Sequence, residues 1–380
     1  MPGLYVHIPF CKKKCAYCDF ISFPDYSAED LYFVALIKEI RQYAPLMRDR
    51  VFDTVFLGGG TPTSLKPGRL AAMISELKKA FTIKENAEIT SEANPESADE
   101  EKLNELFSAG VNRLSLGLQS ADDKVLKGIG RIHTKEDFLR AIDTARRVGF
   151  TNINADVMHG LPGETEESYL DTLKLLFSLN IPHISSYALI LEEHTPLYES
   201  VKSGKISLPD PDAVADMEDA GFDLLENNGY NRYEVSNFAL PGFECRHNLN
   251  YWNNGEYLGL GLNSHSALRI RGEWTRFNNT ENLKEYIGEL GEDKLPVRNT
   301  RAIPRDEEMF ETVMLGLRKT EGLSRQAFIE RFSEDPAVKY APAISELELD
   351  GMMTVSDDAL KLTRRGMDFQ NEALIKFMDQ

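Results

Sequence analysis

Residues 3–18 have the sequence GLYVHIPFCKKKCAYC, in which a group of cysteines follows an apolar run. The run from Leu4 to Ile8 predicts a short β-strand. Cys11, Cys15 and Cys18 follow with the spacing C-x3-C-x2-C, so one loop carries three of the four cysteines in 380 residues. So few cysteines exclude a disulfide scaffold, and clustered thiols are typical of metal-binding or catalytic sites. We expect three thiolates on this loop to converge on one inorganic centre.

The first half of the chain alternates predicted strands with predicted helices. Runs like the first one predict strands at Leu4–Ile8, Asp53–Leu57, Glu88–Glu92, Leu114–Leu118, Ile153–Val157 and Ile184–Ala188. Helical periodicity lies between them at Ala28–Tyr43, Lys66–Phe81, Lys135–Val148 and Glu164–Leu179, with one more helix capped by Ser97 or Asp99 and ended by Gly110. The intervals suit βα units, in which a crossover with its helix needs about 30 residues. They predict a parallel sheet covered by helices.

The positions of polar residues favour one of two sheet architectures. Gly58–Gly60, Glu92, Gln119, Asp156 and Tyr187 each lie at or just past the C-terminal end of a predicted strand. Barrel enzymes build their sites on that rim from several strands, whereas a doubly wound sheet places its site at one switch point. We therefore predict an α/β fold with a partial (β/α)6 barrel.

Two smaller regions are expected after the barrel. A helix at Asp212–Asn228 completes a barrel domain over residues 1–228, and short aromatic strands with Asn and Gly turns predict a β-rich extension over residues 229–300. Residues 301–380 predict a small, mostly helical, winged-helix-like C-terminal domain with helices at Asp306–Arg318, Ser324–Phe332 and Tyr340–Leu349, a strand pair around Thr354–Leu362 and a helix after Gly366.

The net charge and the hydropathy of the chain indicate which partners and which cellular compartment to expect. The chain has 43 Lys and Arg against 61 Asp and Glu, a net charge of −18. Proteins that bind nucleic acid by neutralising phosphates need a basic surplus, so no nucleic-acid partner is expected. The N-terminus lacks the pattern of a signal peptide, and no run approaches the roughly 18 apolar residues of a membrane span. We expect a cytoplasmic protein with no transmembrane segment.

Two kinds of inorganic centre fit the three thiols. Structural zinc almost always takes four protein ligands, but position 20 is Phe20 and the remaining cysteine is the distant Cys245. Three thiolates on a four-iron cluster leave one iron open for a substrate or cofactor. The spacing favours the iron–sulfur cluster, with zinc and three free thiols as the alternatives.

The motif Y-x-HIPFC-x3-C-x-YC at residues 5–18 resembles the signature of radical S-adenosylmethionine (SAM) proteins. More narrowly, it resembles the branch that contains oxygen-independent coproporphyrinogen III oxidases and HemW-type heme chaperones, and the resemblance extends over nearly the whole chain. It implies that Cys11, Cys15 and Cys18 ligate a [4Fe-4S] cluster. The amine and carboxylate of SAM would occupy the open iron.

The resemblance also implies a set of SAM contacts. Residues 58–62, GGGTP, match a glycine motif that contacts the SAM amino group, and bare glycines permit close backbone approach. Alone, three glycines after a strand could form a phosphate loop, but Pro62 and the missing Lys-Ser/Thr ending argue against a P-loop. Carboxylates suit ribose hydroxyls or an ammonium, and arginine suits a carboxylate. The implied SAM contacts are Tyr5, Tyr17, Gly59, Gly60, Thr61, Glu92, Gln119, Arg131 and Asp156.

Two departures argue against porphyrinogen oxidation. Coproporphyrinogen oxidases carry a longer segment before the cluster and usually a further cysteine two positions after the third. Here Cys11 follows only ten residues, and Phe20 replaces that cysteine.

The HNxxYW sequence at residues 247–252 resembles the heme-binding motif of HemW-type proteins. It implies His247 as the heme ligand, since neutral imidazole is a common axial ligand, with Tyr251 and Trp252 as packing partners. Cys245 could be an alternative ligand or a small buried residue, and His265 is a further candidate.

The resemblance thus implies a heme chaperone that carries a [4Fe-4S] cluster and SAM, binds heme and transfers it to apo-hemoproteins. Respiratory hemoproteins as clients, peripheral membrane contact through those clients, and a homodimer are further expectations. No catalytic residue is assigned. The alternative function is that of an oxygen-independent coproporphyrinogen III oxidase, which decarboxylates propionates oxidatively by radical SAM chemistry.

Overall fold

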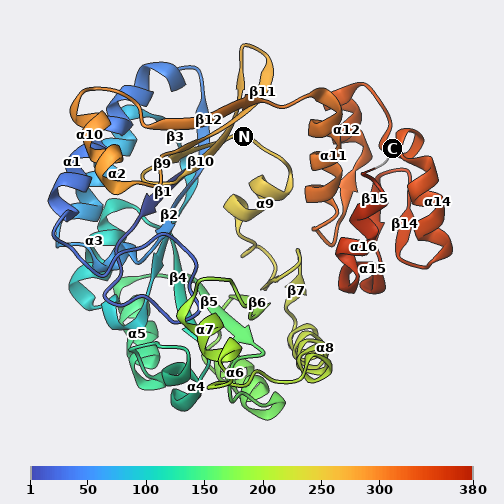
Figure 1. Cartoon of the computed structure of the whole chain (residues 1–380), viewed down its shortest axis with the longest axis horizontal. Helices are drawn as coiled ribbons and strands as arrows, with labels where there is room; N and C mark the ends of the chain where they lie inside the picture. Colours follow the sequence, from blue (N-terminus) through green and yellow to red (C-terminus); the bar gives the residue numbers. More distant parts are fainter. Residues whose placement is uncertain (1, 379–380) are drawn as a thin grey trace.

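A computed structural model describes residues 2–378; Met1 and the last two residues of the predicted range 301–380 lie outside the described residues. Six parallel strands form the centre of the sheet: β1 (Gly3–Ile8), β2 (Val51–Gly59), β3 (Thr82–Ala93), β4 (Arg113–Gln119), β5 (Asn152–His159) and β6 (His183–Ala188). Strands that follow each other in sequence are neighbours in the sheet. This order is that of a barrel, because a doubly wound sheet reverses its strand order at a switch point. The predicted partial barrel is confirmed, and Figure 1 shows its curvature.

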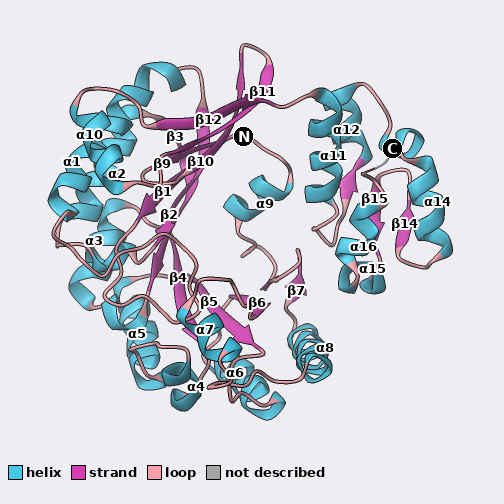
Figure 2. Cartoon of the chain, in the orientation of Figure 1, coloured by secondary structure: helices cyan, strands magenta, loops and turns pink. Residues whose placement is uncertain are grey.

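Helices cover the convex face of the sheet (Figure 2). Those predicted from periodicity are α1 (Glu29–Tyr43), α2 (Arg69–Ala80), α3 (Glu100–Ala109), α5 (Lys135–Val148), α6 (Glu166–Ser178) and α8 (Pro211–Asn227). The short helices α4 (Asp123–Gly128) and α7 (Pro196–Lys202) were not predicted. Of the two predicted caps for α3, Asp99 is the residue that accepts a hydrogen bond from the Lys102 backbone. Gly110 ends the helix with φ +97°, a conformation that favours glycine.

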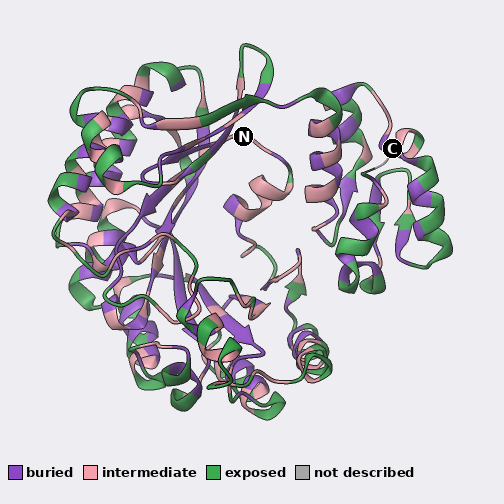
Figure 3. Cartoon of the chain, viewed as in Figure 1, coloured by how far each residue is buried: buried purple, intermediate pink, exposed green. Residues whose placement is uncertain are grey.

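Alternation along β1 separates the core from the inner face of the barrel. Leu4, Val6 and Ile8 are buried in the main core, which also contains Leu36 and Ile40 of α1. The intervening side chains point to the opposite, concave face because successive residues of a strand alternate. Figure 3 shows the resulting pattern, in which the helices expose their outer faces and bury their inner ones.

Residues 229–302 extend the barrel sheet at both edges. Their elements are β7 (Asn231–Arg232), β8 (Asn237–Ala239), α9 (Arg246–Trp252), β9 (Tyr257–Leu260), β10 (His265–Ile270), β11 (Glu273–Asn279), α10 (Leu283–Gly291) and β12 (Val297–Ala302). The strand β8 pairs with β6 and β9 pairs in parallel with β1, which gives a twelve-stranded sheet within the described residues. Aromatic residues and turns predicted strands in this region, but the HNxxYW residues form the helix α9. It lies between β2 and the C-terminal region (Figure 1).

The C-terminal region has a core of its own. It comprises α11 (Arg305–Gly316), β13 (Leu323–Ser324), α12 (Arg325–Phe332), α13 (Pro336–Lys339), α14 (Ala341–Leu349), β14 (Met353–Val355), β15 (Ala359–Leu362), α15 (Arg364–Asp368) and α16 (Gln370–Ile375). Met309, Phe328 and Leu360 are among the buried residues of this second core. Three predicted helices and the strand pair are present, and β13 adds a third strand. Among residues 2–378, no helix has the length and apolar character needed to cross a membrane.

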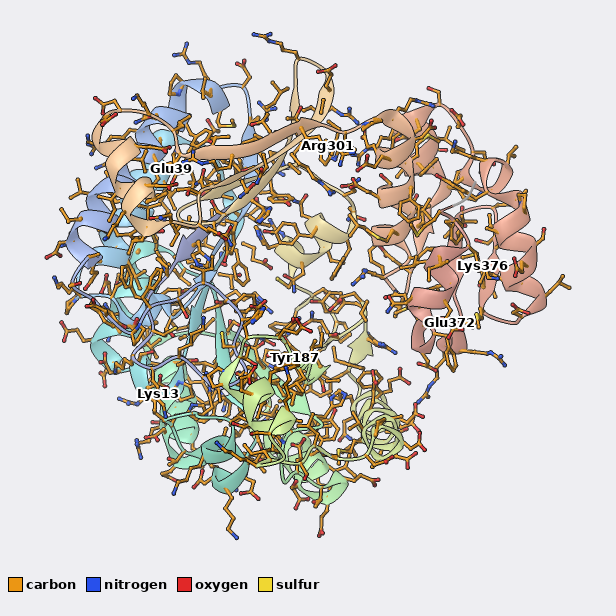
Figure 4. The ribbon with its side chains drawn as sticks, viewed as in Figure 1. Lys13, Glu39, Tyr187, Arg301, Glu372 and Lys376 are labelled. Carbon is orange, nitrogen blue, oxygen red and sulfur yellow. The ribbon has the colours of Figure 1, made fainter. Side chains whose placement is uncertain are left out.

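A buried carboxyl group ties α1 to the extension. Glu39 accepts hydrogen bonds from the Gly261 backbone at 2.7 Å, the Asn279 side chain at 2.6 Å and the Tyr286 hydroxyl at 2.5 Å. Figure 4 labels Glu39 beside α10. Burial raises the pKa of Glu39 to about 7, although these hydrogen bonds oppose the shift.

We predict that Glu39→Gln makes the free energy of unfolding less dependent on pH. Because the folded-state pKa is raised above the ordinary value of 4.5, the contribution of Glu39 is fully present below about pH 4.5 and is lost as the pH rises through about 7. The shift corresponds to about 3 kcal/mol at most. Denaturant unfolding between about pH 5 and about pH 8 measures this difference. Glu101→Gln, at an exposed position of α3, is the control. Equal pH slopes for wild type and Glu39→Gln would contradict the prediction.

Candidate functional site

The three clustered cysteines lie on the loop after β1, at the carboxyl ends of the barrel strands. All three are free thiols, and they line one cavity, called here the cysteine cavity. Thr61 Oγ1 donates to Cys11 Sγ at 3.4 Å, and Arg131 Nη1 lies 3.5 Å from Cys15 Sγ. Burial raises the pKa of the Cys18 thiol to about 11 and also raises that of Cys11. Among residues 2–378, no three His, Cys, Asp or Glu side chains converge closely enough to hold a single metal ion.

The cysteine cavity also gathers most of the predicted SAM contacts. Besides the thiols, its lining includes Tyr17, Gly59, Gly60, Thr61, Glu92, Gln119, Arg131 and Asp156. These residues come from five different strand ends and the loops that follow them, which is how barrel sites are built. Tyr5 does not line it; its hydroxyl lies 3.0 Å from His7 Nδ1 beside a different cavity. The structure thus brings eight of the nine residues together, and their contact with SAM stays a prediction.

The glycine segment is pressed against the cysteine loop. Gly60 N donates to Ile8 O at 2.8 Å, and Thr61 N donates to Phe10 O at 2.7 Å. Gly59 has φ +111°, and a side chain there would collide with the His7 ring. A Cβ on Gly60 would lie 2.6 Å from the Phe10 carbonyl oxygen. The sequence implied close approach of SAM to these glycines, which stays a prediction. The structure shows close approach between two segments of the protein.

Two carboxyl groups share this buried site. Burial raises the pKa of Glu92 to about 7, and the nearby charge of Asp156 adds to the effect. Burial also raises the pKa of Asp156, against hydrogen bonds from Asn154 and Ser115. Like charges at close range disfavour full ionisation of both groups. A cationic ligand would relieve that repulsion, and the amine and sulfonium of SAM are cationic.

Three further residues of the cysteine cavity were not among the predicted contacts. Asn94 donates from Nδ2 to Thr61 Oγ1 and accepts from Arg131 Nη2, both at 2.9 Å. Ser115 lines the cavity beside Asp156, and Tyr187 donates to Gln119 at 3.3 Å (Figure 4 labels Tyr187). Asn94 directly follows β3, so the strand-end criterion applied to Glu92 would also have found Asn94.

The histidine of the HNxxYW motif is enclosed in the barrel. His247 is 1% exposed and stacks on Phe56, with ring centroids 5.2 Å apart. Its Nδ1 lies 2.7 Å from Thr54 Oγ1, and its Nε2 lies 2.9 Å from the Tyr251 hydroxyl. Burial lowers its pKa to about 3, so the ring is neutral.

The predicted role of His247 as a heme ligand is not tested by these contacts, but they show what the role would require. Both ring nitrogens are engaged inside the protein. Its role as a heme ligand stays a prediction that requires one of the two contacts to break, because iron binds through a single ring nitrogen. Cys245 is also buried, with Sγ 3.5 Å from Glu88 Oε1, and burial raises its pKa to about 12. By contrast, Tyr251 and Trp252 line a cavity of about 580 Å³.

Sequence comparisons identify the family. Residues 5–176 match the radical SAM superfamily and residues 303–369 match the HemN C-terminal domain. The heme chaperone HemW of Bacillus subtilis is 35% identical over the whole of both chains. HemW of Escherichia coli is 34% identical and covers 99% of this chain and 98% of its own. The chain belongs to the HemW heme chaperone family.

The HemW family lies within the radical SAM superfamily, which implies a [4Fe-4S] cluster and SAM in place of zinc. Among solved structures, the coproporphyrinogen III oxidase HemN of Escherichia coli, described as a radical SAM enzyme, superposes with a TM-score of 0.85 and 27% identity. The match covers 99% of this chain and 90% of HemN. The α/β barrel and the helical C-terminal region are therefore shared with HemN.

We predict that Gly60→Ala lowers the cluster content. The added methyl group would displace the segment just before Cys11, and overpacking of this kind costs about 1–3 kcal/mol in the free energy of unfolding. Iron and sulfide per chain after anaerobic reconstitution measure the effect. Gly288→Ala is the matched control, because a Cβ there would meet no atom within 4 Å apart from its chain neighbours and its own helix backbone. Wild-type cluster content in Gly60→Ala would show that the close approach does not position Cys11.

We predict that Asn94→Ala weakens SAM binding while the cluster is retained. Its side chain holds Thr61 and the guanidinium of Arg131 in place, and loss of a hydrogen bond to a charged group corresponds to about a tenfold rise in the dissociation constant. Calorimetric titration of reconstituted protein measures this constant. Asn104→Ala, an exposed change on α3, should bind as wild type does. An unchanged constant in Asn94→Ala would refute the positioning role.

Proposed function

We propose that this protein is a heme chaperone that binds heme and hands it to apo-hemoproteins, and that it carries a [4Fe-4S] cluster and SAM. The observation that carries the proposal is the full-length relationship to proteins named heme chaperones, with 35% identity over the whole of both chains. Respiratory hemoproteins as clients, a homodimer, and a cytoplasmic location with membrane contact through clients belong to the same proposal. The three-part division at residues 228 and 300 is proposed with it.

The residues of the cysteine cavity suit the cluster and SAM. Cys11, Cys15 and Cys18 would hold the cluster, which supplies an open iron and one-electron chemistry when bound. Glu92 and Asp156 would take the cationic and ribose groups of SAM, and Arg131 would pair with its carboxylate. Tyr17 would cover the adenine.

The extension supplies cavities for a flat apolar ligand. Tyr251, Trp252 and Tyr257 line the cavity of about 580 Å³, which falls in the size range of small-molecule sites. Aromatic side chains provide large apolar contact surfaces and stack on planar rings. Heme binding in this region is therefore compatible with a buried His247.

The second candidate is porphyrinogen oxidation. The observation that favours it is the likeness to HemN over 99% of this chain. Against it stands Phe20, which is 68% exposed beside the cysteine cavity at the position where the oxidases usually carry a cysteine.

One reconstituted sample tests both functions. We predict that anaerobically reconstituted protein binds about one heme per chain by Soret titration and transfers it to an added apo-hemoprotein faster than free heme is taken up. The same sample should not convert coproporphyrinogen to protoporphyrinogen when SAM and a reductant are added. Turnover of coproporphyrinogen would establish the oxidase, and the absence of heme binding would overturn the chaperone proposal.

A further inference from the structure

Two cavities meet at His265. The first is called here the Phe20 cavity. It has a volume of about 500 Å³, and its lining includes Tyr5, Phe20, Tyr257 and His265. The second, about 580 Å³, is the Trp252 cavity, which also contains Arg276. Tyr251, Tyr257 and His265 line both, so the two cavities adjoin along these three side chains.

The His265 ring is available to a ligand. It is exposed at the start of β10, and among residues 2–378 no hydrogen bond or ion pair engages its side chain. His7, His183 and His247 have both ring nitrogens bonded inside the protein. His133 and His159 are buried.

His194 is the other exposed histidine, and it lines neither cavity. His265 is thus the histidine that combines an exposed ring with a position at the junction of the two cavities.

The surroundings of His265 favour the neutral form of its ring. Partial burial lowers the pKa of His265, and the guanidinium of Arg276 lowers it further. Neutral imidazole is the form that binds metal ions, because a ring nitrogen must offer its lone pair.

Aromatic side chains line the two cavities that adjoin at His265. Tyr251 and Tyr257 meet edge to face, with centroids 4.7 Å apart and planes at 90°. Phe20 is 68% exposed although it is a large apolar residue, and it lines both the Phe20 cavity and the cysteine cavity. An apolar ligand in the Phe20 cavity would cover this side chain and gain hydrophobic contact.

A cationic group completes the lining. Arg276 lines the Trp252 cavity and is paired through Nη1 with Glu311 at 2.6 Å. A guanidinium binds carboxylates well, and heme carries two propionates. The lining thus combines a free imidazole, aromatic walls and one arginine, and Asp19 and Glu281 line the Phe20 cavity. Repulsion from these two carboxylates places the propionates on the Arg276 side.

We infer that His265 is the axial ligand of a metalloporphyrin seated across the two cavities, against Tyr251, Tyr257 and Phe20, with Arg276 near a propionate. The inference rests on the proposed heme-binding function and replaces His247 by His265 as the residue that binds iron. The imidazole nitrogen donates its lone pair to ferric iron and displaces a bound water, with no change in oxidation state. Because Phe20 also lines the cysteine cavity, the bound porphyrin would lie next to the SAM site.

The test compares His265→Ala, His247→Ala and the control His194→Ala in the full-length reconstituted protein. Ferric heme is titrated by Soret absorbance, and resonance Raman spectra report the axial ligand. We expect His265→Ala to weaken heme binding about tenfold or more and to lose the histidine-ligated spectrum, with the spectrum restored by added imidazole. His194→Ala should match wild type, and His247→Ala should keep the spectrum although its melting temperature falls.

Metal-free protoporphyrin IX provides a second readout. Its fluorescence titration should give similar affinities for wild type and His265→Ala, because the aromatic contacts remain and only the iron bond is lost. A wild-type heme spectrum in His265→Ala would overturn the inference. Loss of the histidine-ligated spectrum in His247→Ala, with the fold intact, would also overturn it. Equal weakening of heme and protoporphyrin in His265→Ala would also overturn it, since the loss would not involve iron. If wild type binds no heme, the proposed function itself fails.

Discussion

The close approach of two backbone segments, the end of β1 and the glycines after β2, fixes the geometry of the site. Gly60 N and Thr61 N donate to the carbonyl oxygens of Ile8 and Phe10. A Cβ at Gly60 would occupy the space between them. The hydrogen bonds continue the parallel pairing of β1 with β2 beyond the sheet. The cysteine loop therefore starts from a fixed position on the barrel rim, facing the side chains contributed by β3, β4 and β5.

A second constraint lies on the concave face, where α9 packs against β2. Glu88 of β3 accepts hydrogen bonds from the backbone of Arg246 and His247, both at 3.0 Å. A carboxylate is favourable at a helix N-terminus, so this contact holds the start of α9. At the other end, Asn254 donates to Thr312 of α11 at 3.0 Å. The helix α9 and the turn after it thus link the barrel to the C-terminal region. The histidine of the motif is buried on the barrel side, against Thr54 and Phe56.

The arrangement places two chemical environments side by side. The cysteine cavity contains three thiols, two carboxyl groups and a guanidinium. The neighbouring Phe20 cavity combines aromatic rings and a free imidazole with the carboxylates of Asp19 and Glu281. Phe20 lies at the boundary and lines both. A large apolar side chain exposed at this position would contact an apolar ligand bound next to the cluster loop.

The sequence by itself determined the features that depend on local pattern. Apolar alternation and helical periodicity located β1–β6 and the main helices, because neighbouring residues decide which face of an element is buried. The rule that barrel sites lie at strand ends identified Glu92, Gln119 and Asp156, because parallel strands bring these ends to one rim. The spacing of the cysteines indicated the inorganic centre for the same local reason.

Only the tertiary structure decided which histidine is available. Sequence placed His247 in a heme motif, but the Thr54 hydroxyl that holds it is 193 residues away along the chain. Likewise, Asn94 is linked to Thr61 and Arg131 from other strand ends, and β9 reaches β1 across most of the chain. Burial and hydrogen bonding depend on which distant segments pack together, so a residue's availability for chemistry follows from the packed fold and not from its motif.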